Sequence, residues 1–318
     1  MINVAIVMVN YNTGELVAEN FHKNFSSVQR EGFNLHLFLV DNLSTDNSFT
    51  VLTNAIREQG LENCVTLIQA ECNGGFAYGN NLGLAEALSG NFSPDYFYLL
   101  NPDAYLLPGA IEALVDFSKK SSDECILGSI LHDEQLTPRT SAFSFPTLVT
   151  EFRRGMPLQI LERIFPRPNF DLASGPLKVD WVSGACFFFS RKVFERLGWM
   201  DQSYFLYFEE VDYMRQARQV GVPVYSVPTS GVVHVAGAST KVVGSSRKGG
   251  AMPDYWYESW HRYFNKNHSR MYACFTGLAW LSGRALNKLL AVIRPARKVN
   301  DGHSMARFFR KGILGVRN

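Results

Sequence analysis

The sequence predicts an α/β fold in which a mostly parallel sheet is flanked by helices. Short apolar runs alternate along the chain with segments of helical character, as in doubly wound sheets. Each run stops abruptly at a group of Asn, Asp or Gly residues. With 318 residues and 46% hydrophobic content, the chain can bury a sizeable core, as one large domain or two smaller ones.

The first two units of strand, turn and helix have similar polar turns. Residues 4–9 form an apolar run that ends at Asn10, and Thr13 is the expected cap of the helix that follows. Residues 35–40 repeat the pattern and end in DNLSTDNS, before a helix that should run to about Gln59. Polar groups are therefore expected at the ends of both strands.

A glycine-rich loop follows the third predicted strand, residues 65–69. Its sequence, NGGFAYGNNLG, has neither the GxGxxG spacing nor the GK[ST] of a P-loop, and it precedes a helix expected over residues 82–88. Glycines at such a junction let backbone amides approach a diphosphate, but they are equally typical of a simple turn. Both interpretations stay open.

The fourth predicted strand, residues 96–100, ends at Asn101-Pro102-Asp103. Ligands of open α/β sheets bind outside the carboxyl ends of the strands, so Asp103 is expected to face a metal or a phosphate there. An Asp that merely caps a turn is the alternative. Another buried strand is expected over residues 185–189.

Charge is distributed unevenly along the chain. Residues 270–318 contain ten Lys or Arg against Asp301 alone, which gives +9 and leaves 2 − 9 = −7 for residues 1–269. Such a basic tail fits an anionic surface, either lipid or nucleic acid. A nucleic-acid partner is disfavoured, because the rest of the chain is net acidic and carries no recognition motif.

The cysteines and the N-terminus indicate a reducing compartment. The five cysteines are scattered and form no CxxC pair, so neither a disulfide framework nor a zinc site is indicated. The chain runs from Met1 directly into strand residues without a basic leader, and no apolar stretch approaches the roughly 18 residues of a membrane span. We therefore expect a cytoplasmic protein, peripheral at the inner face of the cytoplasmic membrane.

Several blocks occur in a fixed order: VMVNYN, VDNLSTDNS, NGGFAYGNN, LLNPDA, then WVSGACFFFSRKVFERLGWMDQSYFLYFEEVDYMRQARQVG and a trailing His234. In this order the chain resembles family 2 glycosyltransferases of the GT-A fold, a Rossmann-like α/β sheet. The bacterial rhamnosyltransferase branch is the most similar. The resemblance covers about residues 3–236 and depends on the set of blocks, since no single block is specific.

The resemblance implies a nucleotide-sugar site and a divalent cation, Mg²⁺ or Mn²⁺. Residues 101–103 occupy the place of the family's DXD motif, and since only Asp103 is acidic, the cation is expected on Asp103 and His234. The residues implied for the nucleotide-sugar are Tyr11, Asn12, Asp41, Asn42, Asn73, Gly75, Phe76, Asn80 and Asn101.

The resemblance also implies a general base in the block YFLYFEEVDY. Glu210 aligns with the base, and Glu209 and Asp212 are the alternates. Acidic residues at a helix N-terminus also occur simply because they favour the helix dipole. The acceptor side is implied at Trp181, Ser183 and Gly184, although a Trp at a strand entry is more often core packing.

We expect a catalytic domain over residues 1–265 and a basic amphipathic helical region over residues 266–318. Within the first, a nucleotide-sugar half should cover about residues 1–131 and an acceptor half about residues 132–265. The Pro-rich segment 132–180 breaks the strand and helix rhythm, so we expect it to cover the acceptor and to become ordered on binding.

The chain from about Asp254 predicts an aromatic-rich helix, followed by apolar sequence with basic residues. This pattern fits a membrane anchor with its aromatic groups at headgroup level, or a helix packed on the catalytic domain. Together the features predict an inverting, metal-dependent transferase that moves L-rhamnose from dTDP-L-rhamnose to a lipid-linked glycan in cell-surface polysaccharide synthesis. A UDP-hexose donor and a catalytically silent nucleotide-sugar or glycan-binding module are the alternatives.

Overall fold

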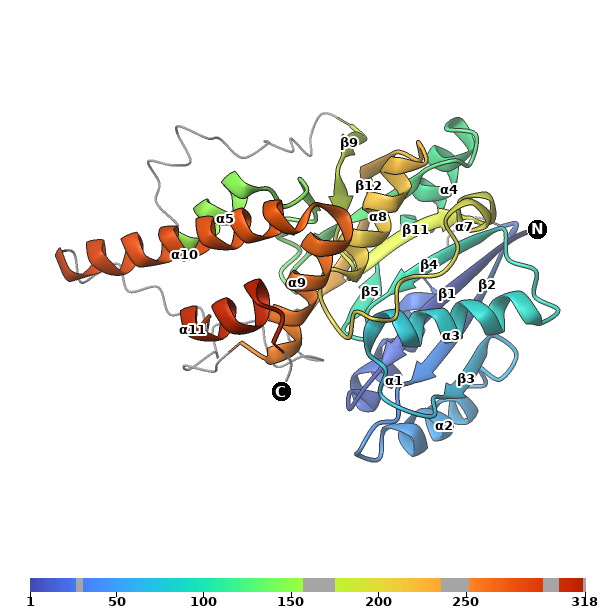
Figure 1. The fold of residues 1–318 in the computed structure, drawn as a ribbon. Helices are drawn as coiled ribbons and strands as arrows, with labels where there is room; N and C mark the ends of the chain where they lie inside the picture. The colour runs from blue at the N-terminus through green and yellow to red at the C-terminus, as the bar shows by residue number, and fades with distance from the viewer. Residues whose placement is uncertain (27–30, 157–174, 236–251, 294–302, 317–318) are drawn as a thin grey trace. The chain divides into compact units, whose positions relative to one another are not determined.

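The computed structural model describes residues 1–26, 31–156, 175–235, 252–293 and 303–316 (Figure 1). The chain divides into two compact units. Unit 1 takes its residues from Met1–Phe143, Phe170–Phe205 and Glu209–Gly244, and unit 2 takes its residues from Ser144–Asn169, Leu206–Phe208 and Ser245–Asn318. The expected domain boundary at residue 265 stays a prediction.

Unit 1 is an α/β unit. Its strands are β1 Ile2–Asn10, β2 Phe33–Asp41, β3 Val65–Gln69, β4 Tyr96–Leu100, β5 Ala104–Leu106, β6 Ile126–His132, β7 Pro138–Arg139, β8 Ala142–Phe143, β9 Leu177–Val179, β10 Trp181–Val182, β11 Cys186–Ser190 and β12 Val224–His234. Its helices are α1 Gly14–Phe25, α2 Ser48–Glu58, α3 Gly75–Ser89, α4 Ala110–Lys120, α7 Arg191–Leu197 and α8 Glu209–Gln219.

The main sheet has the strand order β3-β2-β1-β4-β11-β6-β12-β5. The strands β3, β2, β1 and β4 are parallel, β11 is antiparallel to both of its neighbours, and β12 is parallel to β6. The predicted α/β class with a mostly parallel sheet is confirmed. The strand expected over residues 185–189 is β11.

Two apolar clusters, one on each face of the sheet, explain why the strands read as continuous apolar runs. Along β1, Ile6 and Met8 belong to one cluster, while Ala5 and Val7 belong to the other. Successive strand side chains point to opposite faces, so both faces of β1 are buried. A strand covered on both faces has no polar alternation to show in its sequence.

Two local expectations need correction. Helix α3 begins at Gly75 rather than at Leu82, and Gly79 and Gly83 lie inside it. A Cβ on Gly83 would lie 2.4 Å from Val7 Cγ1, so the glycine allows the helix to pack directly on β1. Thr13 occupies the N-cap position of α1 without a side-chain cap, because its hydroxyl donates to Asn10 Oδ1 (2.7 Å) instead.

The segment 132–180 is more regular than expected. It contains β7, β8 and β9 of unit 1 and the helix α5, Leu148–Gly155, of unit 2. Thr147 caps α5 by accepting a hydrogen bond from Thr150 N, which explains how the helix begins. Residues 157–174 lie outside the described residues, and the role of the segment over the acceptor stays a prediction.

Unit 2 contains α5, α9 Asp254–Asn267, α10 Arg270–Ile293, α11 Met305–Arg307 and a π-helical turn, η2 Phe308–Ile313. The aromatic helix expected from Asp254 is α9. Its aromatic side chains form the core of unit 2, so the expectation that they lie at lipid headgroups is wrong: Trp256, Tyr257, Trp260, Tyr263 and Phe264 are buried. None of the helices in the described part of the chain is long and apolar enough to cross a bilayer.

Candidate active site

The parallel register of the sheet brings Asn10 and Asp41 side by side at the ends of β1 and β2. Asp41 is buried and accepts hydrogen bonds from Asn10 Nδ2 (2.7 Å), Ser44 Oγ (2.6 Å) and Ser44 N (3.0 Å). These donors compensate the carboxylate for its loss of water. The turn after β2 is therefore built around Asp41.

The turn after β1 is joined to the same network. Asn12 N donates to Ser44 Oγ (2.9 Å), and Thr45 N donates to Asn12 Oδ1 (2.8 Å). Asn12 is exposed and Tyr11 is half-buried, so both can meet a ligand. The structure thus brings Tyr11, Asn12 and Asp41 together where β1 and β2 end, and their role toward a nucleotide-sugar stays a prediction.

Asn42 connects the turn after β2 with the glycine-rich loop. Its Nδ2 donates to Asn73 Oδ1 (3.1 Å) and to Gly75 O (3.0 Å), and Gly75 N donates to Asn73 Oδ1 (3.3 Å). Gly75 has φ +85°, and a Cβ there would lie 1.8 Å from Phe205 O. Only glycine fits this position.

The N-terminus of α3 is partly used by the protein itself. Gly75 N is bonded to Asn73, and Phe76 N donates to Phe205 O (2.9 Å). The side chain of Asn80 donates to Phe76 O within the helix (2.9 Å). These bonds hold the loop in shape and leave fewer amides for an anion, so the role of Asn73, Gly75, Phe76 and Asn80 toward a diphosphate stays a prediction.

Asp103 and His234 meet where β5 begins and β12 ends. His234 is the strand partner of Ala104, and His234 Nε2 lies 3.1 Å from Asp103 Oδ1 and 3.5 Å from Asn101 Nδ2. Asp103 is 1% exposed. Neighbouring ligands of an octahedral ion with bonds of about 2.1 Å lie about 3 Å apart, so this pair fits two adjacent coordination positions.

The described residues hold no group of three or more His, Cys, Asp or Glu side chains that could bind a metal by themselves. One carboxylate and one imidazole nevertheless form a donor set that Mn²⁺ accepts, whereas Mg²⁺ prefers oxygen. Asp103 and His234 thus fit part of a cation's coordination sphere, although their role as ligands stays a prediction.

The two adjacent glutamates begin α8. Glu209 is 4% exposed, whereas Glu210 is only partly buried and lies beside Gly184, where a Cβ would be 3.3 Å from Glu210 Cγ. Burial raises the pKa of Glu210 to about 7, and burial together with the charge of Glu210 raises the pKa of Glu209 well above its usual range. A carboxylate with a pKa near neutrality is suited to general-base catalysis.

The third candidate base, Asp212, is fully buried and accepts a hydrogen bond from Gln216 Nε2 (2.8 Å) within α8. Of the three acidic residues, Glu210 is the least buried, although its Oε2 atom is enclosed. All three also lie in the first turn of α8, where they favour the helix dipole. The raised pKa and the position beside Gly184 favour Glu210 as the base.

The residues expected on the acceptor side differ in their surroundings. Trp181 stacks on Phe143 with a centroid separation of 4.3 Å and packs on the core, which matches the packing interpretation of this residue. Ser183 N donates to Ser141 O (2.9 Å). Gly184 lies beside Glu210, so its lack of a side chain keeps space next to the candidate base.

Residues 206–208 precede the two glutamates, and sequence analysis assigned them no role. Tyr207 and Phe208 have φ of +72° and +69°, a conformation that costs a bulky residue of the order of 1–3 kcal/mol. Their aromatic rings pack on α9, with Phe208 5.8 Å from Trp256 and 5.4 Å from Tyr263 between ring centroids. No local sequence signal marks such a backbone.

The packing on α9 is extended by two further contacts. Ser259 Oγ donates to Leu206 O (3.0 Å), and Tyr207 stacks on Tyr255 at 6.1 Å. Strained backbone persists where its surroundings over-determine it, and such strain is frequent at functional sites. Within unit 2, these contacts with α9 compensate the unfavourable backbone of residues 206–208.

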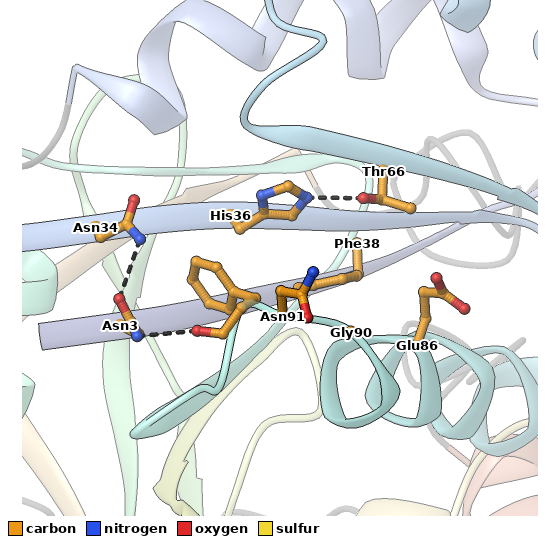
Figure 2. Close-up of a pocket in the computed structure, with 9 residues that line it drawn as sticks. Asn3, Asn34, His36, Phe38, Thr66, Glu86, Gly90 and Asn91 are labelled. Carbon is orange, nitrogen blue, oxygen red and sulfur yellow. Dashed lines mark hydrogen bonds between the residues drawn. The ribbon is translucent and has the colours of Figure 1, made fainter.

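Another hollow, of about 500 Å³, lies near the opposite ends of β1 and β2 (Figure 2). Its lining includes Asn3, Asn34, His36, Thr66 and Glu86, and His36 Nε2 lies 2.7 Å from Thr66 Oγ1. None of the predicted site residues lines it. The residues predicted for the nucleotide-sugar at Tyr11, Asp41 and Asn101 lie at or directly after the carboxyl ends of β1, β2 and β4 instead.

The chain belongs to a known family of enzymes. The profile of Glycosyl transferase family 2 matches residues 5–198, so the chain is a member of this family. The predicted resemblance to the family, and to its rhamnosyltransferase branch, is confirmed by the relatives described next.

Three curated relatives have sugar-transferase names. The chain is 29% identical over 153 residues to N-acetylglucosaminyl-diphospho-decaprenol L-rhamnosyltransferase of Mycobacterium tuberculosis, covering 46% of this chain and 48% of that protein. It is 25% identical over 232 residues to the low-salt glycan biosynthesis hexosyltransferase Agl10 of Haloferax volcanii, covering 73% and 67%. It is 25% identical over 166 residues to the rhamnosyltransferase WbbL of Escherichia coli, covering 51% and 61%. The chain thus spans about half the length of the first relative.

Solved structures share the fold at low identity. GalNAc-T7 crystallised with UDP, GalNAc and Mn²⁺ has a TM-score of 0.58 and 14% identity, covering 98% of this chain and 56% of that chain. Residues 1–349 of TarS from S. aureus have a TM-score of 0.53 and 11% identity, covering 99% and 91%. At these identities the likeness concerns the fold alone.

The packing of residues 206–208 predicts the effect of Phe208→Ala. Removing the ring frees the chain before Glu209, and misplacing a reacting group by about 1 Å can cost about 10²-fold in rate. We expect kcat, measured from the nucleoside diphosphate that is formed, to fall about 10-fold to 100-fold. The KM for the donor should change little. Phe208→Tyr, which keeps the ring, should retain most of kcat. An unchanged kcat in a folded Phe208→Ala protein would contradict this role.

Proposed function

We propose that the chain is an inverting, metal-dependent glycosyltransferase that transfers L-rhamnose from dTDP-L-rhamnose to a hydroxyl of a lipid-linked glycan. The observation that carries the proposal is the position of two polar groups in unit 1. The Asp41 network follows β1 and β2, and the partly buried Glu210 begins α8 beside Gly184. A donor at the first and an acceptor hydroxyl at the second would supply both partners of a sugar transfer.

The choice of rhamnose is supported by two relatives named as rhamnosyltransferases. The name of the first also supports an acceptor linked through a diphosphate to a polyprenol, which a lipid-linked glycan would match. A hexose carried by another nucleotide is the second candidate donor, because the relative that covers most of this chain is named a hexosyltransferase.

Nucleotide recognition would use the turns after β1 and β2. Tyr11 and Asn12 would line the base and ribose together with Asn42, while Asp41 keeps the two turns in place through its three donors. These hydrogen bonds are made between groups of the chain itself, so the protein holds the two turns in shape. Asn73 and Asn101 would face the diphosphate side of the donor.

Asp103 and His234 would hold a divalent cation. When bound, the cation would neutralise negative charge that develops on the leaving diphosphate. Hard cations at phosphates are commonly held by one or two protein ligands, with phosphate and water oxygens as the others. The separation of 3.1 Å between Asp103 Oδ1 and His234 Nε2 supports this assignment. Asn101 would add a neutral polar group beside them.

Glu210 would accept the proton of the acceptor hydroxyl as its oxygen attacks the sugar carbon. With a pKa of about 7, it is half ionised near neutrality and still basic enough to take the proton. Glu209 would stay protonated near neutrality, because its burial and the charge of the adjacent Glu210 both oppose its ionisation. A single base and no protein nucleophile fit direct displacement with inversion.

We place the reaction at the cytoplasmic face of the membrane, because a lipid-linked acceptor is confined to a bilayer. The basic sequence of residues 270–318 supports this location, because its ten Lys or Arg residues and one acidic residue, Asp301, give a net charge of +9.

The base assignment predicts a pH profile. Glu210 must be deprotonated to act, so kcat should rise with pH and level off above about 7, where the raised pKa is passed. Glu210→Gln should lower kcat by about 10²–10⁴-fold and abolish this rise. Glu209→Gln should retain turnover and leave the pH of the rise unchanged, because Glu209 is protonated near neutrality and Gln is neutral as well. Normal turnover by Glu210→Gln would exclude Glu210 as the base.

The donor assignment predicts selective thermal stabilisation. A ligand that binds the folded chain at 100 times its Kd stabilises it by about 2.7 kcal/mol, so dTDP with Mn²⁺ or Mg²⁺ should raise Tm. The shift should shrink in Asp103→Asn and should be smaller for UDP and GDP. A larger shift in Tm with UDP than with dTDP would favour a UDP-hexose over dTDP-L-rhamnose as the donor. No shift with any nucleotide would contradict the proposed transferase and favour a silent module that binds glycan.

A further inference from the structure

Helix α10 directs large apolar side chains outward. Met271 is 70% exposed, Leu289 is 62% exposed and Phe275 is 55% exposed, and Leu278 and Leu286 are exposed as well. At about 100° per residue, these five positions fall within an arc of about 80° on the helix. They form one continuous stripe, which we call the outer stripe.

The opposite side of α10 is the one that packs on the protein. Ala273, Thr276 and Trp280 are at most 4% exposed, and the polar side chains of Arg284 and Asn287 are buried on the same side. A Cβ on Gly283 would lie 2.4 Å from Phe152 O of α5, so the two helices are in close contact, as Figure 1 shows.

This arrangement reverses the usual one. A helix on a soluble unit normally buries its aliphatic stripe and exposes its polar residues. Here the buried side combines Ala273 and Trp280 with an arginine, an asparagine and a threonine, while the aliphatic stripe faces outward. Packing among the described residues of unit 2 therefore does not account for the outer stripe.

The charges beside the outer stripe are positive. Within the described side chains of α10, the exposed charged residues are Arg270 and Lys288. They are eighteen positions apart, about five helical turns, and so lie on the same side of the helix. Exposed apolar groups bordered by cations match an anionic lipid surface, where acyl chains and headgroups meet.

We propose that the outer stripe of α10 enters the headgroup and acyl boundary of an anionic bilayer, with the helix axis in the membrane plane. This inference rests on the proposed function and deepens it, since it assigns the membrane contact to one helix face. Lipid fits better than a second copy of the chain, because a two-fold contact through this face would bring the Arg270 and Lys288 borders of two α10 helices together.

Vesicle flotation of the full chain tests the surface. The variant carries Phe275→Gln and Leu289→Gln, and the matched control carries Leu136→Gln and Val220→Gln, two exposed apolar residues of unit 1. Vesicles contain equal amounts of phosphatidylglycerol and phosphatidylcholine, or phosphatidylcholine alone. We expect the partition coefficient on the anionic vesicles to fall at least tenfold for the variant and less than twofold for the control. The wild-type chain should bind neutral vesicles several-fold more weakly.

Two outcomes would overturn the proposal. One is equal flotation of the variant and the wild-type chain. The other is a variant that changes from dimer to monomer on size exclusion while its flotation is unchanged, which would make the stripe an interface between copies. The dTDP-induced shift in Tm should be the same in the variant and the wild-type chain. Failure of the surface therefore leaves nucleotide binding intact, whereas failure of the transferase removes the shift from both proteins.

Discussion

The parallel pairing of β1 with β2 and β4 is the constraint on which the rest of the site depends. Both faces of these strands are buried, so the strands can end only where the chain reaches polar residues that solvent or a ligand can satisfy. Register then decides which polar residues meet. Asn10 is paired with Asp41, and the carboxylate of Asp41 organises the turns that would receive a nucleotide. The antiparallel strand β11 continues the same sheet toward the half that holds Gly184.

The candidate base depends on a different feature, the acidic first turn of α8 and the residues that precede it. The chain enters α8 through Tyr207 and Phe208, whose unfavourable backbone is compensated by aromatic packing on α9. Glu209 and Glu210 then lose water together, so that one carboxyl keeps its proton and the other titrates near neutrality. The aromatic residues of α9 thus have a packing role within unit 2, and the proposed membrane contact is assigned to α10.

Sequence reasoning succeeded where hydrophobic burial alone determines the outcome. The run from Tyr96 to Leu100 had to be a buried strand, and the polar residues after it had to lie at the sheet edge. It failed where tertiary contacts override local signals. The start of α3 at Gly75 depends on the close approach of Gly79 and Gly83 to β1, and the burial of Trp256 and Trp260 depends on a core that unit 2 builds from distant segments. The positive φ values of Tyr207 and Phe208 have no local cause, so sequence could not reveal them.

The measurement that tests the central account most directly is the configuration at C1 of the transferred sugar, compared by NMR with that of the donor. In this account the nucleotide-sugar binds at the turns after β1 and β2, and Glu210 activates the attacking hydroxyl. The transfer is then a single displacement, which predicts complete inversion. A product with retained configuration would require a second displacement or attack from the leaving-group side. It would contradict both the role of Glu210 and the arrangement of donor and acceptor.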